Sequence, residues 1–468
     1  MERMSGIDAS FLYFETPNMH MHVVAAIVFD PSTVPGGYSF DHVKEMIRSR
    51  LHLAKPLRRK LVPTPLNLDH PVWVEDNDFD LDYHVRRIGC PSPGSEEQLS
   101  EIVGDIASRP LDRTRPLWEV WIVEGLENGY TAAVAKMHHC TIDGVSGANF
   151  MVHFFDLEPQ GTERPGVDAD WKPDRRPTDL ELLGRALIAR AQRPLNWVRV
   201  VPATLKSVGG FIAARRRTEG PGMPTPLRAP RTSFNATITP HRRTAFTHVP
   251  LDDVKAIKRE FGTTVNDVVL AIVAGALRRY LESRDEMPDR SLLAAVPVSV
   301  RTGEEEGDVG SNRVSAMFST LATDVDDPVE RLKQIAEANR GAKEEHKAIG
   351  ADMLTKWGEL AAPLTFSLAA RFYTGLKLAD RHAVVHNLVI SNVPGPAFPL
   401  YFAGAKLVAM YPLGPIFDGA GLNITVLSYM DQLYFGLIGC REIVDVWGIA
   451  GHITESFAEL SKAAQAHA

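Results

Sequence analysis

Strand-like and helix-like segments alternate in both halves of this chain, and that alternation constrains the fold more than any other feature of the sequence. A proline-bounded, helical zone over 166–235 separates the halves, which run over 1–165 and 236–468. Such a zone is typical of a connection between domains. Interleaved strands and helices on both sides of it favour an α/β sandwich-like fold over a helical bundle or an all-β domain.

The first half contains three clear strand signals. The apolar, β-branched run His22–Phe29 predicts a buried strand. Trp118–Val123 and Tyr130–Met137 predict two more strands, joined by the turn Glu127-Asn128-Gly129. Because Asn and Gly both tolerate positive φ angles, this turn predicts an antiparallel hairpin.

The second half repeats the mixture of helices and strands. An apolar helix is expected over Val268–Leu281, and Thr264 or Asn266 is suited to cap its N-terminus. Further buried strands and a late hairpin are expected at Leu292–Val300, Leu388–Asn392, Asn423–Tyr429 and Leu433–Ile438.

Charge and cysteine content exclude several classes of protein. The 468 residues include 51 Lys and Arg and 58 Asp and Glu, so the formal charge is −7. Nucleic-acid-binding domains usually carry a basic excess, and we therefore expect no nucleic-acid partner. The three cysteines form no CxxC pair, which argues against a disulfide framework or a zinc knuckle and for a reducing compartment.

The sequence indicates peripheral rather than integral contact with membranes. The N-terminus lacks the basic region and apolar core of a secretory signal. The longest apolar stretches, Val23–Phe29 and Val268–Leu277, fall well short of the roughly 20 residues that a membrane-spanning helix needs. We expect a cytoplasmic location, and the sequence indicates no particular oligomeric state.

A compact group of polar residues lies between a predicted strand and a predicted helix. It reads His138-His139-Cys140-Thr141-Ile142-Asp143-Gly144. A histidine here can remove a proton from an attacking hydroxyl because its ordinary pKa lies near neutrality. Asp143 can fix the imidazole or its loop, and Gly144 allows a tight turn into the helix.

Adjacent residues of an extended segment point to opposite faces, so His138 and His139 should not both line one cavity. This geometry also disfavours both as ligands of one metal ion, and no metal site is expected. Residue types alone also allow a non-catalytic interpretation, in which the two histidines lie on the surface and Asp-Gly only forms a turn and a helix cap. Cys140 could serve as a nucleophile, but a small buried filler is the preferred interpretation.

The motif resembles the HHxxxDG motif of the CoA-dependent acyltransferase superfamily, which includes condensation domains and chloramphenicol acetyltransferases. More narrowly, the chain is similar to the bacterial wax ester synthase/diacylglycerol acyltransferase family. The resemblance spans nearly the whole chain in six further segments, in order: Ser5-xx-Asp8-xx-Phe11-Leu12-xx-Glu15 with Met21-His22-Val23, then Arg115–Glu119, Thr264–Ala271, Val296–Arg301, Gly310–Arg313 and Ser391–Pro396.

This resemblance implies two chloramphenicol-acetyltransferase-like sandwich domains that form a pseudo-dimer around a central channel, joined by a helical linker. His139 is then the expected general base, beside His138, and Asp143 holds the loop through an arginine. Acyl-CoA is the expected co-substrate, with no metal or redox cofactor. The segment His20–Ala25 is bulkier than the glycine-containing strand that the family pattern leads us to expect.

Four further positions are candidates for shaping the channel. Asn266 and Asp267 suit either that role or helix capping. Ser391 and Asn392 could donate hydrogen bonds near the oxyanion, although a strand that ends in a Pro/Gly turn explains them as well.

The sequence as a whole predicts an O-acyltransferase that esterifies diacylglycerol, a long-chain alcohol, or both. One alternative is a condensation-type enzyme that uses a carrier-bound acyl donor. The other is a catalytically silent lipid-binding protein of the same fold. Aromatic, aliphatic and arginine side chains mix over 195–217, so this segment could contact a membrane or lipid droplet.

Overall fold

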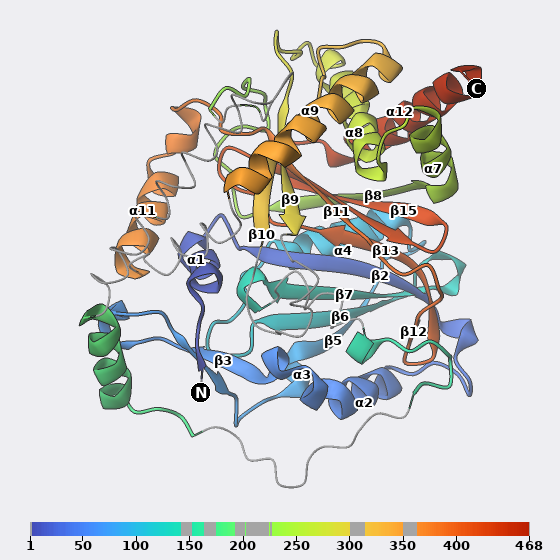
Figure 1. Cartoon of the computed structure of the whole chain (residues 1–468). Helices are drawn as coiled ribbons and strands as arrows, with labels where there is room; N and C mark the ends of the chain where they lie inside the picture. Colours follow the sequence, from blue (N-terminus) through green and yellow to red (C-terminus); the bar gives the residue numbers. More distant parts are fainter. Residues whose placement is uncertain are drawn as a thin grey trace.

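The computed structural model describes residues 2–141, 152–162, 175–191, 202, 224, 227–299, 314–349 and 363–467. Within them, the strands form two six-stranded sheets and one three-stranded sheet, with helices between and around them (Figure 1). This mixed α/β arrangement agrees with the fold class predicted from the alternation of segments.

The first large sheet has the order β12-β13-β2-β7-β6-β5. The predicted hairpin is confirmed, because β6 pairs with β7 antiparallel and the turn holds Asn128 and Gly129 at φ angles of 59° and 72°. Helices α2 (Phe40–Arg50), α3 (Leu81–His84) and α4 (Glu96–Ala107) accompany these strands, whose bounds are β2 His22–Asp30, β5 Val85–Gly89, β6 Trp118–Glu124, β7 Thr131–His138, β12 Tyr401–Phe402 and β13 Ala405–Leu413.

The second large sheet has the order β10-β9-β11-β14-β15-β8. The late hairpin is confirmed as β14 and β15, which turn at Met430 with a φ angle of 54°. The strands are β8 Arg242–Pro250, β9 Leu293–Ser299, β10 Val314–Thr320, β11 Leu388–Val393, β14 Leu422–Tyr429 and β15 Gln432–Cys440, and the helices are α7 Leu251–Glu260, α8 Val265–Glu282, α9 Pro328–Ile349 and α12 Val446–His467.

A third, smaller sheet lies at one side of the molecule. Its order is β1-β4-β3, from Glu2–Arg3, Val72–Glu75 and Arg59–Val62. Helices α1 (Gly6–Phe14) and α11 (Pro363–Gly375) lie near it (Figure 1). A helical segment over 179–191 packs on this sheet, because Leu182 shares a buried cluster with residues of β3 and β4.

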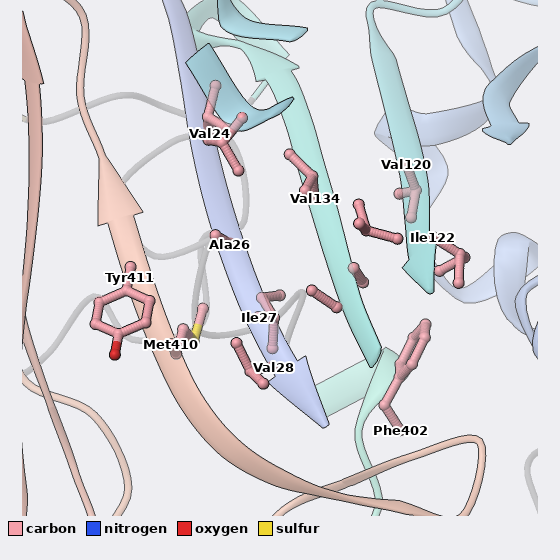
Figure 2. Close-up of a cluster of buried hydrophobic side chains, with 14 of the residues drawn as sticks. Val24, Ala26, Ile27, Val28, Val120, Ile122, Val134, Phe402, Met410 and Tyr411 are labelled. Atoms are coloured by element: carbon pink, nitrogen blue, oxygen red, sulfur yellow. The ribbon is translucent and has the colours of Figure 1, made fainter. Parts of the chain in front are cut away.

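The core of the first sheet draws on both ends of the chain. Figure 2 shows buried side chains of β2, β6 and β7 beside Phe402 of β12 and Met410 and Tyr411 of β13. Strand β13 pairs antiparallel with β2, from Lys406 opposite Asp30 to Leu413 opposite Val24. The division at 1–165, 166–235 and 236–468 stays a prediction, but one segment of the second half completes the sheet of the first.

The two large sheets meet where β13 lies against β8 and β15. The ring of Tyr411 stacks on Phe246 with centroids 4.5 Å apart, and the Tyr434 hydroxyl donates to the carbonyl oxygen of Val408 at 2.9 Å. Gly436 of β15 approaches this seam so closely that an added Cβ would stand 2.0 Å from the carbonyl oxygen of Pro412. Only a residue without a side chain fits there.

In the part of the chain that the structure describes, no single helix has both the length and the apolar content to cross a bilayer. Helices α7 and α8 reach that length and apolar content only when they are taken together, and the pair is bent by 103° at the break between them.

Replacing Gly436 by alanine should destabilise the protein. The new methyl group would push against the backbone of β13, and overpacking of this kind typically costs about 1–3 kcal/mol of unfolding free energy. Urea unfolding followed by circular dichroism measures the change. Gly451→Ala is the matched control, because Gly451 is exposed on α12 and its Cβ would meet no atom within 4 Å. Equal midpoints for both variants would contradict the proposed steric role of the seam.

Candidate active site

Backbone pairing fixes the two motif histidines at the end of β7. His22 of β2 lies opposite His138 in the sheet register. The next residue, His139, begins a short 3₁₀ turn, η6 (His139–Thr141), and its backbone N–H donates to the carbonyl oxygen of Met21 at 2.9 Å. The start of β2 therefore holds the chain where it leaves the sheet.

His138 is buried, and its hydrogen bonds determine its tautomer. The backbone N–H of Cys140 points to Nδ1 of His138 at 3.2 Å, so Nδ1 accepts and the proton of the neutral ring sits on Nε2. Nε2 faces the carboxylate of Glu15 at 3.4 Å, which is long for a hydrogen bond. Burial lowers the pKa of His138 below its ordinary value, although Glu15 partly opposes that shift. His138 is thus neutral, with one ring nitrogen hydrogen-bonded and the other facing a carboxylate.

Glu15 is itself held by Arg113. Nε of Arg113 donates to the Glu15 carboxylate at 3.0 Å, and the same guanidinium donates to the carbonyl oxygen of Leu12 at 3.0 Å. Burial alone would raise the pKa of Glu15, but the contacts with His138 and Arg113 bring it below its ordinary value. The carboxylate therefore stays charged and fixes the buried imidazole behind the motif.

His139 has a different environment. Its ring stacks on Phe11 of α1, with centroids 4.0 Å apart and planes inclined by 22°. Its side chain is partly exposed, whereas its Nδ1 atom is buried and has no hydrogen-bond partner among the described residues. Burial lowers the pKa of His139 to about 4. The imidazole is consequently neutral near pH 7, the state that a general base requires.

Two further histidines lie behind the motif. His20 and His22 are buried with their rings stacked 5.4 Å apart, and the ring of His22 meets that of His138 edge-on at 6.0 Å. Burial lowers the pKa of His20 to about 4 and that of His22 well below its ordinary value. The bulky segment found in the sequence therefore supplies a row of neutral imidazoles that packs against His138.

Asp143 and Gly144 lie outside the described residues, so their roles stay predictions. The other predicted positions fall on regular elements. Asp267 forms a capping box with Thr264, the N-cap of α8, and also accepts a hydrogen bond from the amide of Asn339 at 2.8 Å. This favours capping for Asp267. Asn266 lies in the first turn of the same helix and is partly buried.

Ser391 and Asn392 are partly buried on β11, opposite Thr425 and Val426 of β14. Within the described residues, neither side chain hydrogen-bonds to a motif histidine. The predicted strand is confirmed as β11 and ends at Val393, and a role of Ser391 and Asn392 near the oxyanion stays a prediction.

Cys140 is poorly suited to act as a nucleophile. It is only 4% exposed, and burial raises the pKa of its thiol well above the ordinary value. Its sulfur lies 2.9 Å from Nδ1 of His138. A nucleophilic cysteine needs a depressed pKa and access to substrate, so the filler interpretation is favoured.

The roles of Glu15, Arg113 and Phe11 were not deduced from the sequence. Phe11 and Glu15 belong to the opening segment that resembles the acyltransferase family. That resemblance was the one signal in the sequence that pointed to these two residues. Arg113 lies 98 residues from Glu15 along the chain, and no local pattern connects them. Over the described ranges, no cluster of three or more His, Cys, Asp or Glu side chains is placed to hold a metal ion.

Comparison with known proteins decides the family. The model of the wax ester synthase/diacylglycerol acyltransferase catalytic domain matches residues 4–269, and that of the WS/DGAT C-terminal domain matches residues 310–461. The chain belongs to the wax ester synthase/diacylglycerol acyltransferase family. It is an acyltransferase, as the motif and the six further segments predicted.

Relatives cover almost the full length of this family member. A Mycobacterium tuberculosis protein named as a candidate diacylglycerol O-acyltransferase is 40% identical over 462 residues, which cover 98% of this chain and 90% of the relative. A second such M. tuberculosis protein is 38% identical over 468 residues, with 99% and 97% of the two chains covered.

Solved structures agree with the fold. The wax ester synthase/diacylglycerol acyltransferase from Marinobacter aquaeolei VT8 is 30% identical and covers 99% of this chain and all of its own, with a TM-score of 0.70. The first condensation domain of the calcium-dependent antibiotic synthetase is 15% identical, covers 99% and 96% of the two chains, and has a TM-score of 0.56. The two-domain acyltransferase architecture predicted from the sequence is thereby confirmed.

Glu15→Gln should reduce turnover more than substrate binding. The amide keeps the shape of the carboxylate but removes its charge, and a hydrogen bond to a charged group contributes about 1.5–3 kcal/mol. We expect kcat for ester formation to fall about tenfold or more, with KM for the acyl donor unchanged. Steady-state kinetics at several donor concentrations measures both constants.

Glu15→Asp, which restores the charge at a shorter reach, should recover part of the lost turnover. If KM rises and kcat stays constant, Glu15 contributes to substrate binding and not to the positioning of His138.

Proposed function

We propose that this acyltransferase moves an acyl group from acyl-CoA to the hydroxyl group of diacylglycerol, of a long-chain alcohol, or of both. His139 acts as the general base. One observation carries this assignment: His139 is the neutral, partly exposed motif histidine, whereas His138 is buried, with Nδ1 hydrogen-bonded to Cys140 and Nε2 facing Glu15.

The reaction follows from this arrangement. The acceptor oxygen attacks the thioester carbonyl carbon while its proton passes to the imidazole of His139. The tetrahedral intermediate then collapses, the carbon–sulfur bond breaks, and His139 returns the proton to the departing CoA thiolate. The products are an ester and free CoA thiol, and the step is redox-neutral. It needs no metal or redox cofactor, since a neutral base and oxyanion stabilisation suffice.

The rigid stacking on Phe11 supports this role of His139. A general base works best when its position is fixed before the substrate arrives. The 2.9 Å bond from the His139 backbone to Met21 and the ring contact at 4.0 Å fix both the chain and the side chain. Asp143, predicted to hold the loop through an arginine, would add a further constraint.

We propose these acceptor alcohols because of the names of the related proteins. The M. tuberculosis proteins carry diacylglycerol O-acyltransferase names, and the Marinobacter protein is named for both wax ester and diacylglycerol chemistry. Both acceptors partition into lipid phases, so we place the enzyme peripherally on the inner face of a membrane or on a lipid inclusion. The segment 195–217, predicted to make such contact, falls largely outside the described residues.

Replacing the base tests the assignment directly. Free thiol released from palmitoyl-CoA is measured with diacylglycerol or hexadecanol as acceptor, for the wild type and for His139→Ala. Loss of a general base commonly lowers the rate by about 10²–10⁴-fold, so acceptor-dependent release should nearly vanish in the variant. His42→Ala, at an exposed histidine on α2, should retain the wild-type rate.

Other outcomes would identify the alternatives. Thiol release only with a carrier-bound acyl donor would indicate the condensation-type reaction. A folded wild type that releases no thiol with either acceptor would indicate the silent lipid-binding role. Equal release by wild type and His139→Ala would mean that another group removes the proton.

The pH dependence provides a second test. A base works only when unprotonated, and burial lowers the pKa of His139 to about 4. Activity that depends on this group should therefore persist from pH 8 down to about pH 5 and decline only as the pH approaches 4. The profile of kcat/KM against pH reports the free enzyme. A midpoint near 6.5, the ordinary value for histidine, would contradict a base whose pKa is lowered by desolvation.

A further inference from the structure

Exposed apolar side chains gather on one part of the molecule. Nine of the fifteen large hydrophobic side chains exposed among the described residues lie on α1, the β3–β4 connection, the helical segment 179–191 and the α11 region. Single exposed hydrophobic residues are normal, whereas a contiguous group marks an interaction surface. The nine are Phe14, Leu66, Leu180, Leu187, Ile188, Leu364, Leu368, Phe372 and Leu376.

The α11 region supplies the most regular part of this group. Leu364, Leu368 and Phe372, with Leu376 directly after the helix, are spaced four residues apart and are 43–64% exposed. Residues at this spacing lie on one face of a helix. The helix is anchored from another side, where Phe366 packs edge-on against Phe14 of α1 at 4.8 Å. α11 thus presents an apolar stripe while remaining attached to the element that carries Phe11.

The segment 179–191 has the same two-sided character. Leu182 and Ala186 are buried, and Leu182 packs against valines of β3 and β4. Leu180, Leu187 and Ile188 instead are 81%, 53% and 62% exposed. Figure 1 shows this segment and α11 along the same side of the molecule.

A cavity of about 690 Å³ lies between these elements. Leu12, Leu61 and Leu368 supply apolar parts of its wall, and Arg113, Arg176 and Arg371 supply charge. Arg113 is the residue that holds Glu15 behind His138. The cavity therefore begins beside the exposed stripe and reaches Arg113, one of the residues behind the motif.

The charges around the stripe favour one kind of partner. Arg371 and Lys377 are exposed on and just after α11, whereas 179–191 carries exposed charges of both signs, Asp179, Glu181, Arg185 and Arg190. The sequence from 363 to 379 contains no Asp or Glu. Apolar side chains with arginine and lysine beside them match a lipid surface with anionic head groups, where the apolar groups enter the interface and the cations meet the head groups. Two copies that met through α11 alone would instead bring cations against cations.

We propose that the face formed by α11 and 179–191 docks on an anionic lipid surface, and that the adjoining cavity admits lipid from that surface toward His139. The lipid substrate rests on the proposed function, whereas the docking rests on the stripe and its charges. With 13 residues, α11 is shorter than the roughly 20 that cross a bilayer, so it lies in the plane of the surface.

Vesicle sedimentation with the full chain tests the docking. The vesicles contain either phosphatidylcholine alone or phosphatidylcholine with phosphatidylglycerol. The stripe variant is Phe372→Ser/Leu376→Ser, at two exposed residues that do not line the cavity. We expect at least tenfold weaker binding of this variant to the anionic vesicles. Leu157→Ser removes another exposed leucine, 62% exposed, and should bind as the wild type does. Circular dichroism and the melting temperature verify that each variant is folded.

Charge reversal separates the two parts of the face. Arg371→Glu/Lys377→Glu keeps the apolar stripe but removes the cations. This variant should bind both vesicle types equally, and added salt should no longer weaken its binding. Wild-type binding that is equal on both vesicle types, or stripe-variant binding equal to that of the wild type, would overturn the proposal. A wild-type dimer that the stripe substitutions dissociate would do the same, since the face would then join two copies of the chain.

An activity assay keeps this proposal distinct from the proposed function. Ester formation is measured with diacylglycerol presented in anionic vesicles and, separately, with hexanol and decanoyl-CoA free in solution. The stripe variant should be slow in the first assay and equal to the wild type in the second. If the wild type were inactive in both assays, the proposed function would be refuted. The vesicle-binding experiment would still show whether the face docks on lipid. Equal slowing in both assays would overturn the docking, because the stripe would then affect the reaction itself.

Discussion

The pairing of β2 with β7 is the interaction on which the site depends. It sets His22 opposite His138 and brings the carbonyl oxygen of Met21 to the backbone of His139. A shift of one residue in this register would send every side chain of the strand to the opposite face. The many apolar contacts of β2 in the core therefore do more than stabilise a sheet, because they determine which histidine is buried behind the motif and which is partly exposed.

Much of the fold follows from patterns within short stretches of sequence. The Asn128-Gly129 turn, the Thr264 cap and the hairpin around Met430 all depend on neighbouring residues, and each was predictable for that reason. The order of strands was not. Nothing within residues 401–413 signals that β13 pairs with β2, since such a pairing depends on two sheets with complementary edges and on the space that Gly436 leaves at their seam.

The site shows the same division. Residue chemistry and resemblance indicated His138, His139 and Asp143, and the structure assigns distinct environments to the two histidines. The contact from Arg113 through Glu15 to His138 could not be derived from the sequence, because it joins three segments that lie far apart along the chain. The burial that lowers the pKa of His139 arises from α1 and the end of β7 together, so it also becomes visible only after the chain has folded.

The crossing of β12 and β13 affects how the chain folds during synthesis. Until residues 401–413 emerge from the ribosome, β2 has an open edge with a row of unpaired backbone groups and apolar side chains. At about 5–20 residues per second, the delay after β2 is made is on the order of tens of seconds. Open apolar edges invite pairing with other chains. The first sheet therefore keeps an open edge until a segment about 380 to 390 residues after β2 has been made.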